Sequence, residues 1–254
     1  MDLVPVPEVL HHGVVRASVL AYQVDVIAGL SLDQDPDSWV FTTDLSLRAR
    51  PVPAPEVVTA RFTVLREGRR SSTSDVELTA SDGAPIGAAS IGFARVPRRE
   101  GDAPKPTVTP SMAVELFEHL PFLEHPLREE AGVRVVAPGV AEMNVSPDVQ
   151  NPAGTLQGAM VALLVEAAAE DHVAASTDAD VVVTDLDIRF LDKATIGPVR
   201  SATRALGDGP FDPVEVRLTD IGTGRLTTLA YARAVAVGRR ERAPIGGTLH
   251  LQSP

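Results

Sequence analysis

The sequence contains no cysteine among its 254 residues. A disulfide framework, a metal centre with cysteine ligands and a thiol nucleophile are therefore excluded. Long apolar runs are also missing, because the most apolar stretch, 159–169, is too short to span a membrane and contains Glu166. The first residues include Asp2 and Glu8 but lack the basic and apolar segments of a signal peptide. We therefore expect a cytoplasmic protein that binds no membrane.

Positive charge is scarce as well. The 23 Lys and Arg residues are outnumbered by 34 Asp and Glu residues, which gives a net charge of −11. Proteins that bind nucleic acid need a basic stripe for the phosphates, whereas the basic residues here are scattered along the chain. The six histidines show no HxxxH or HExxH spacing. We therefore expect neither a nucleic-acid partner nor a metal site.

The sequence repeats itself at an offset of 141 residues. Residues 11–48 align without a gap on 152–189, with ten identities in 38 positions, where roughly three would be expected from composition. The repeat predicts two copies of one unit. We place an N-terminal unit at 1–98, a Pro-rich charged linker at 99–110, a C-terminal unit at 111–238 and a disordered tail at 239–254.

Each copy reads as one helix followed by four strands. The helices are expected at 14–30 and 158–175, and the second is apolar almost all round, which indicates a buried helix. Alternating polar and apolar residues indicate strands near 39–49, 56–66, 73–80, 86–96, 181–191, 197–206, 213–221 and 226–237. Hairpin turns are expected at 81–83 and 222–224. A helix near 112–120 and a hairpin within 131–147 precede the second copy, and the first copy lacks both.

Two carboxylates lie on the expected buried helices at equivalent positions of the repeat, Asp25 and Glu166. Burial disfavours the charged form of a carboxyl group unless a partner compensates. Carboxylates in such surroundings are candidates for functional sites. The alternative is a structural pair that water or a cap satisfies where the two units meet.

The loop before the second helix, 151–158, reads NPAGTLQG. Asn151 and Gly154 predict a turn, and Gly158 stands where the helix begins. The first N–H groups of a helix are free and lie at the positive end of its dipole, and glycine lets a substrate oxygen approach them. The loop therefore predicts an oxyanion site, with Asn151 and Gln157 as further donors. Alternatively, these two are an ordinary turn residue and an ordinary first-turn residue.

Residues 151–169 resemble the helix motif of the phenylacetyl-CoA thioesterase-like branch of the hotdog superfamily. That motif reads Asn-x-x-Gly-x-x-His-Gly-Gly, followed by an acidic residue on the helix. Four of its positions are matched, by Asn151, Gly154, Gly158 and Glu166. Gln157 replaces the motif His and cannot titrate, and Ala159 replaces the final Gly. The resemblance covers 110–237 and, more weakly, 11–96.

The resemblance implies an α+β fold. It is a tandem (double) hotdog, in which an antiparallel sheet wraps around a long central helix in each unit. It also implies an enzyme that hydrolyses acyl-thioesters, with an acyl-CoA or an acyl-carrier thioester as its partner. No cofactor is implied, since coenzyme A enters only as part of the substrate. Coenzyme A is itself a polyanion, so a site for it would need local Arg or Lys against the overall negative field. Few aromatic residues, 4%, favour an aliphatic acyl tunnel.

In such families each site joins the Asn/Gly loop of one unit to the helix acid of the other. The first site would then combine Asp25 with the loop residues of the second copy, and Thr43 or Thr42 would lie nearby. The loop residues expected there are Asn151, Gly154, Gln157 and Gly158. Asp25 would orient or deprotonate a water molecule, and the Gly158 N–H would stabilise the oxyanion with help from Asn151.

The second site would combine Glu166 and Thr184 with Leu10, Arg16 and Ala17, and it lacks the motif Asn. We expect the first site to work and the second to be degenerate, with Arg16 close enough to neutralise Glu166. Two other readings stay open. One is an acyl-CoA-binding protein without catalysis, and the other is a hotdog enoyl hydratase or dehydratase, for which His12 would be needed. A homodimer of double hotdogs is also possible.

Overall fold

The computed structural model describes residues 1–102, 105, 112 and 123–239. Within them the strands are β1 Asp2–Leu3, β2 Leu10–His11, β3 Val14–Val15, β4 Ser38–Ala49, β5 Val58–Glu67, β6 Ser71–Ala80, β7 Pro85–Pro97, β8 Arg134–Ala137, β9 Val140–Met143, β10 Ala179–Phe190, β11 Val199–Ala205, β12 Val214–Asp220 and β13 Arg225–Arg239. Eleven of these strands form one sheet in the order β1-β5-β6-β7-β4-β10-β13-β12-β11-β9-β8. Every pairing in it is antiparallel. The remaining two, β2 and β3, form a small hairpin.

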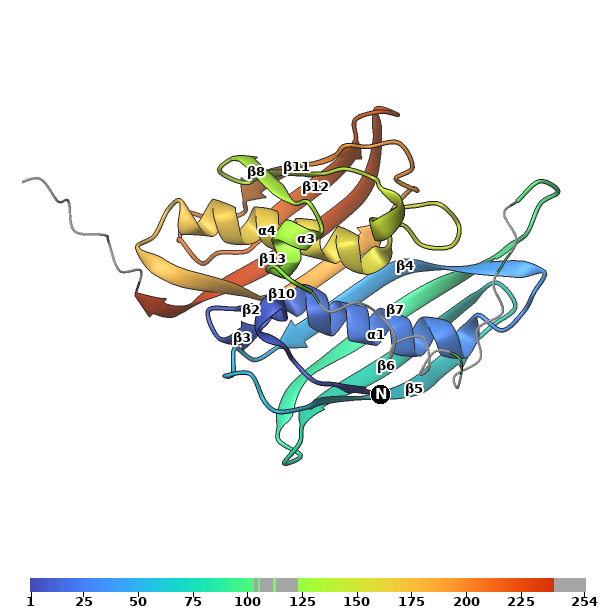
Figure 1. Ribbon diagram of the computed structural model, residues 1–254, viewed down its shortest axis with the longest axis horizontal. Helices are drawn as coiled ribbons and strands as arrows, with labels where there is room; N and C mark the ends of the chain where they lie inside the picture. Colours follow the sequence, from blue (N-terminus) through green and yellow to red (C-terminus); the bar gives the residue numbers. More distant parts are fainter. Residues whose placement is uncertain (103–104, 106–111, 113–122, 240–254) are drawn as a thin grey trace, which may run out of the picture.

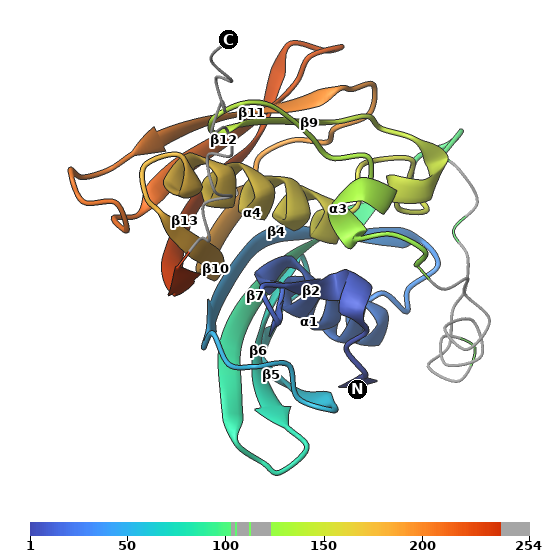
Figure 2. The same cartoon turned by 60° about the vertical axis from the view of Figure 1, so that its left-hand side comes forward.

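Two long helices, α1 Ala17–Leu32 and α4 Gly158–Ala174, pack against each other on one face of this sheet (Figure 1). The sheet curves around them, as Figure 2 shows. Helix α1 contacts β4, β5 and β7, and α4 contacts β9, β10, β11 and β13. A short helix, α3 Leu127–Glu130, and two 3-10 turns, Pro7–Val9 and Pro147–Val149, are the other helical elements within the described residues. Each long helix therefore has sheet on one side and the other helix beside it.

This position explains the sequence of α4. Most of its residues are buried, because the helix has a neighbour on nearly every side. A helix that is apolar all round is stable only in such surroundings. In β10 the residues Leu186 and Ile188 point into the core and are fully buried, while Asp187 on the other face is half-buried. Removal of these side chains from water is the main stabilising contribution.

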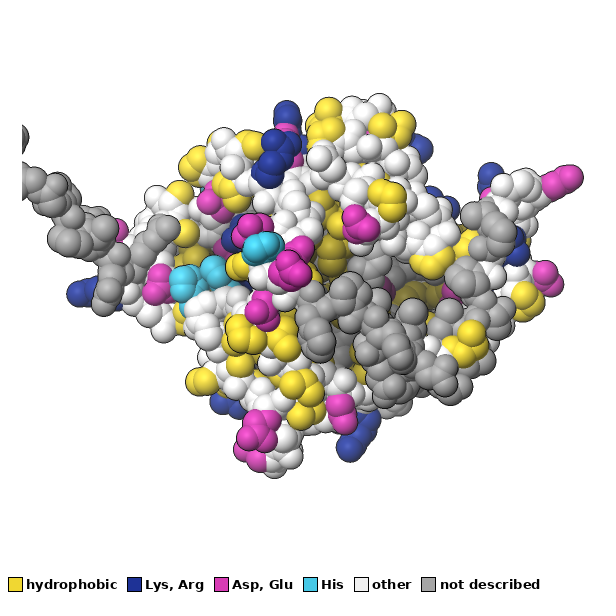
Figure 3. Space-filling model, in the orientation of Figure 1, with side chains coloured by type: hydrophobic (Ala, Val, Ile, Leu, Met, Phe, Trp, Pro, Cys, Tyr) yellow, Lys and Arg dark blue, Asp and Glu magenta, His cyan; other side chains and the backbone are white. Residues whose placement is uncertain are grey.

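The two halves of the sheet join where β4 pairs with β10. Leu45 lies opposite Ile188 and Leu47 opposite Leu186, so the inward side chains continue across the junction. On the outer face, the guanidinium of Arg48 reaches Asp187 at 2.6 Å. On the face of the molecule that Figure 3 shows, lysine and arginine side chains are dispersed.

The expected elements are largely present. Both long helices, all eight predicted strands and the hairpin within 131–147 are confirmed, and the bounds of the helices and strands differ by at most three residues. The turns at 81–83 and 222–224 are confirmed too, and each contains a glycine with positive φ, Gly83 at 82° and Gly224 at 70°. The predicted helix near 112–120, most of the linker and nearly all of the tail lie outside the described residues.

One expectation needs correcting. The first copy was expected to lack the pieces that lead into its helix, yet β1 pairs with β5 in the way that β9 pairs with β11. The first copy therefore keeps a two-residue remnant of that strand, which is too short to show as an alternating pattern. No helix of the described residues is long and apolar enough to cross a membrane.

Candidate active site

Asp25 lies on α1 and faces β4. Its Oδ1 accepts a hydrogen bond of 2.7 Å from the hydroxyl of Thr42. Burial raises the pKa of the Asp25 carboxyl above its ordinary value, and the Thr42 hydrogen bond lowers it in part. A carboxylate whose pKa is raised in this way is a stronger base than a free one. A general base needs this property in the fraction of molecules that carry the charged carboxylate.

The side chain of Asn151 holds the loop before α4 in place through hydrogen bonds to its backbone. Its Oδ1 accepts from the N–H groups of Ala153 at 3.0 Å and Thr155 at 3.2 Å. The carbonyl oxygen is thus used inside the turn, and the amide N–H₂ group is left for other partners. Gly154 has a φ of 74° and serves this turn. It lines neither of the two cavities at the site.

Helix α4 begins at Gly158, and Gln157 is its N-cap without a capping hydrogen bond from the side chain. A Cβ atom at Gly158 would lie 3.3 Å from Oδ2 of Asp25. The start of α4 and the carboxylate on α1 therefore lie close together, at the edge of a shared cavity. In the part of the chain that the structure describes, no acceptor takes the Gly158 N–H.

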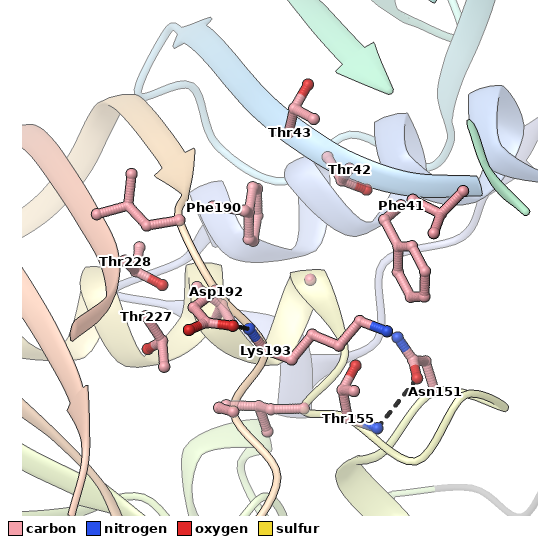
Figure 4. A pocket seen from close by; sticks show the side chains of 16 residues that line it. Phe41, Thr42, Thr43, Asn151, Thr155, Phe190, Asp192, Lys193, Thr227 and Thr228 are labelled. Atoms are coloured by element: carbon pink, nitrogen blue, oxygen red, sulfur yellow. Dashed lines mark hydrogen bonds between the residues drawn. The ribbon is translucent and has the colours of Figure 1, made fainter. Parts of the chain in front are cut away.

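Two adjoining cavities open at this meeting point. The larger, of about 480 Å³, is lined by Asp25, Gln157 and Gly158. The smaller, of about 310 Å³, is lined by Thr43 and Lys193 among others (Figure 4). The two share four lining residues, namely Phe41, Thr42, Asn151 and Gly158. The structure thus brings together Asp25 and the loop residues that the sequence grouped as the first site, except Gly154.

Thr42, and not Thr43, holds the carboxylate. The Thr43 hydroxyl donates to Oδ2 of Asp44 at 2.8 Å. The pairing of β4 with β7 shifts register between Thr42 and Asp44. Both threonines line the smaller cavity, but in Figure 4 the Thr43 side chain points away from Asn151 and Lys193. Such a bulge could not be read from the sequence, which left the two threonines as alternatives.

At the predicted second site, the side chain of Glu166 itself fills the start of helix α1. Glu166 is fully buried. Its carboxylate accepts from the Ser18 N–H at 3.3 Å, the Ser18 hydroxyl at 2.6 Å and Arg16 at 3.4 Å. The carboxylate therefore occupies the free N–H end of α1, next to the buried Ala17. Thr184 was expected beside the acid, but its hydroxyl donates to Asp185 at 2.8 Å.

Further charges surround this carboxylate. Arg16 also reaches Glu170 at 3.1 Å, and the Nε2 atom of His11 lies 3.5 Å from Glu170. Burial, then the charge of Glu166, raises the pKa of Glu170 to about 8. Burial, then the charge of Arg16, lowers the pKa of His11 to about 3. Arg16 is almost fully buried in this network, so it is not free to contact a substrate.

The neighbouring histidine has another role. His12 occupies the β2–β3 turn with a φ of 49° and lies 3.8 Å from Asp180. It lines neither cavity at the first site. The residues that the structure describes contain no group of three or more His, Asp or Glu side chains that could hold a metal ion.

No protein-family model matches the sequence, and no curated protein matches it. Solved structures do match. An acyl-ACP thioesterase from Bacteroides thetaiotaomicron aligns with a TM-score of 0.63 and 12% identity, over 92% of this chain and 96% of that one. A protein of unknown function with a hot dog fold from Alicyclobacillus acidocaldarius aligns with a TM-score of 0.54 and 13% identity, over 96% and 93%. The chain has a hotdog fold. An acyl-CoA thioesterase II from Mycobacterium marinum is also similar, with a TM-score of 0.54 and 16% identity, over 87% and 88%.

Within this hotdog fold, several residues at the cavities carried no signal in the sequence. The larger cavity has an aromatic wall of Tyr22, Trp39, Phe41 and Phe93, where an aliphatic tunnel was expected. The Nζ atom of Lys193 lies 4.0 Å from the centre of the Phe41 ring, and Figure 4 shows its side chain reaching toward Asn151. These residues come from α1, β4, β7 and a loop. Only the folded chain brings them together.

Proposed function

We propose that this protein hydrolyses acyl-thioesters at one working site. The observation that carries the proposal is the approach of the Asp25 carboxylate to the free helix end at Gly158, with Asn151 beside them at the junction of two cavities. General-base chemistry and oxyanion stabilisation need these two groups on either side of a carbonyl carbon. The similarity to structures described as acyl-ACP and acyl-CoA thioesterases supports the same reaction class.

We further propose that the chain is two hotdog units fused in one polypeptide. The N-terminal unit is 1–98, the linker 99–110, the C-terminal unit 111–238 and the tail 239–254. The offset of 141 residues that relates Asp25 to Glu166 also relates Arg16 to Gln157 and Ala17 to Gly158. Helices α1 and α4 have equivalent places on the two halves of the sheet, which supports this reading.

The proposed reaction proceeds in two steps. Asp25 takes a proton from a water molecule while the water oxygen attacks the thioester carbonyl carbon. The negative charge that develops on the carbonyl oxygen is stabilised by the Gly158 N–H and the Asn151 amide. The C–S bond then breaks, the carboxylic acid forms, and Asp25 returns its proton to the leaving thiolate. No cofactor takes part in this proposal, and coenzyme A enters only as part of the substrate.

The asymmetry of the two sites supports a single active one. At the first site the helix end at Gly158 is free and the acid faces a cavity. At the second site the acid, Glu166, itself occupies the helix end and is neutralised by Arg16. A substrate carbonyl has no access to that position. We therefore assign the Glu166 cluster, which includes Arg16 and Glu170, a structural role.

One observation favours a second candidate, an acyl-thioester-binding protein without turnover. Gln157 stands where the resembling motif has a His, and it supplies no titratable group. The hydratase reading has less support, because His12 lies in a turn that lines neither cavity.

The deciding experiment measures thiol release from a panel of acyl-CoA and acyl-pantetheine thioesters with a thiol-reactive dye. The chain has no cysteine, so the protein contributes no background. We expect saturable turnover of at least one thioester. Saturable binding of the panel without any thiol release would replace the hydrolase by the binding protein. If the protein neither binds the thioesters nor releases thiol from them, both candidate functions are contradicted.

A further inference from the structure

Three arginines gather at one end of the N-terminal half of the sheet. Arg69, Arg70 and Arg95 line a cavity of about 700 Å³. The N–H of Arg95 donates to the carbonyl oxygen of Arg70 at 2.9 Å, so the two residues are neighbours across adjacent strands. Along β7, Arg95 follows the buried Phe93 by two positions, and Arg70 precedes the buried Ser72 by two. Arg69 and Arg70 are exposed and lie in the bend before β6, while Arg95 is half-buried on β7, so the three side chains meet at the rim of the sheet.

This arrangement is unfavourable without a counter-ion. Like charges that face each other across two strands destabilise a sheet. In a chain with a net charge of −11, arginines could be spread so that they avoid one another. Arginines whose positive charges repel one another are expected to lie together where they bind an anionic ligand.

The acids nearby neutralise the cluster only in part. Asp35 lines the same cavity, and its carboxylate accepts from the Asp37 N–H at 3.0 Å and the Ser38 hydroxyl at 2.8 Å, so it keeps its negative charge near Arg95 but forms no ion pair with it within the described residues. Asp37 also lines the cavity. Glu67 pairs with Arg95 at 2.5 Å, but its side chain is 51% exposed, and such surface pairs are weak and exchange readily.

The other two arginines have even less compensation. Among the residues that the structure describes, neither Arg69 nor Arg70 has an ion pair. An anion that entered this cavity would find both guanidinium groups available. It would also compete with the single exposed carboxylate of Glu67 for Arg95.

The cluster is continuous with the first site. The cavity that the three arginines line shares Val96 and Pro97 with a neighbouring cavity of about 300 Å³. Arg99 and Lys193 also line this neighbouring cavity. That cavity in turn shares Phe41, Val96 and Lys193 with the smaller cavity of the first site. Thr42 is paired with Phe93, and Phe93 with Ser72. From strand spacing and rise, Thr42 and Arg70 are about 12 Å apart, a distance that a pantetheine arm can span.

We propose that Arg69, Arg70 and Arg95 bind the diphosphate and 3′-phosphate groups of coenzyme A while its thioester lies at Asp25. This inference rests on the proposed thioesterase function. Guanidinium groups bind phosphate oxygens in pairs of parallel hydrogen bonds, so three arginines match a ligand with several phosphates. A carrier protein offers the single phosphodiester of its prosthetic group. The arginines line a hollow and not a flat surface, which favours the compact nucleotide end of coenzyme A.

The test compares binding of coenzyme A with binding of pantetheine, which lacks every phosphate, by titration calorimetry. The wild type should bind coenzyme A at least about tenfold more tightly, since hydrogen bonds to charged groups are among the strong ones. Arg70→Ala and Arg95→Ala should each weaken coenzyme A binding by about tenfold and leave pantetheine binding unchanged. Arg204→Ala is the matched control, because Arg204 is an exposed arginine paired with Glu215 in the other half of the sheet. It should change neither affinity.

The outcomes separate this inference from the proposed function. Equal wild-type affinity for coenzyme A and pantetheine, or unchanged coenzyme A binding in both arginine variants, would overturn the phosphate site. Thiol release from an acyl-pantetheine would then still support the hydrolase. If coenzyme A binding depends on the arginines but no thioester releases thiol, the phosphate site is supported and the hydrolase function is contradicted. Dependence on Arg70 for an acyl-carrier protein but not for coenzyme A would also overturn the assignment.

Discussion

The Thr42 hydroxyl donates to Oδ1 of Asp25 at 2.7 Å and leaves Oδ2 of the same carboxylate facing Gly158. One oxygen is thus fixed by a neutral donor, and the other faces the place where water and substrate would meet. The position 141 residues after Thr42 is Val183, whose backbone N–H donates to Glu170 at 3.4 Å. The two halves of the chain therefore use the same strand position differently.

Replacing Thr42 by valine tests the role of this hydrogen bond. A donor to a carboxylate favours its charged form, so Thr42→Val should raise the pKa of Asp25 further. The acidic limb of the pH profile of kcat/KM should move to higher pH, and kcat/KM should fall by about tenfold. Thr43→Val is the matched control, because its hydroxyl serves Asp44. Equal effects of the two variants would refute the assignment.

A methyl group at Gly158 should block the site without damaging the helix. Its Cβ would lie 3.3 Å from Asp25 and would occupy the space of an approaching carbonyl oxygen. We expect Gly158→Ala to lower kcat/KM by about a hundredfold or more, with little change in melting temperature, since the helix propensity of alanine offsets the crowding against Asp25. The control is Ala17→Gly, the reverse change at the equivalent position, at the start of α1. Full activity in Gly158→Ala would show that the helix end is not where the substrate oxygen lies.

Much of the fold was accessible from the sequence because its signals are local. Alternation along 181–191 and the all-round apolar character of 158–169 depend on nearest neighbours, and both elements formed as expected. The grouping of Asp25 with Asn151, by contrast, needed the repeat and the resemblance to a known motif. No local pattern joins residues so far apart in the chain.

The rest depended on side chains meeting across elements. Ser18 gave no sign that it would bind Glu166, since the contact exists only because α1 and α4 pack together. The choice between Thr42 and Thr43 depended on a bulge in β4. The position of Lys193 over Phe41 depended on a loop. Contacts of this kind are set by tertiary structure, and sequence periodicity carries no record of them.

The buried carboxyl of Glu170 should make stability depend on pH. Its pKa is about 8 in the folded protein against an ordinary value of 4.5. The folded state therefore binds more protons than the unfolded state between these values, and stability falls as pH rises. The lowered pKa of His11 acts in the opposite sense below pH 6.5, and the raised pKa of Asp25 also contributes, so the effect of Glu170 is isolated by comparison with a variant that lacks its carboxyl group, between pH 6.5 and 8.

The matching measurement is urea unfolding of the wild type and Glu170→Gln across that range. The wild type should lose up to about 1.4 kcal/mol per pH unit relative to the variant, which has no proton to lose. A constant difference between the two proteins from pH 6.5 to 8 would mean that Glu170 titrates normally.

Arg16 should be essential for stability. Arg16→Met leaves Glu166 buried without its cation and Glu170 with only the longer pair to Arg128 at 3.7 Å, which should cost about 3–5 kcal/mol of unfolding free energy. Arg48→Met removes an arginine that is 55% exposed and also pairs with two carboxylates, and it should cost under about 1 kcal/mol. Adding Glu170→Gln to Arg16→Met should recover part of the loss. A smaller effect of Arg16→Met than of Arg48→Met would contradict the structural role of the cluster.

The most direct test of the account compares thiol release by Asp25→Asn and Glu166→Gln, at a temperature where both are folded, on a thioester that the wild type turns over. The asparagine keeps an acceptor for Thr42 and cannot take a proton, so kcat should fall by about a hundredfold or more. The Glu166 variant should keep kcat within about threefold, since its carboxylate only closes the second site. Full turnover in Asp25→Asn together with its loss in Glu166→Gln would contradict the account and place the chemistry at the second site.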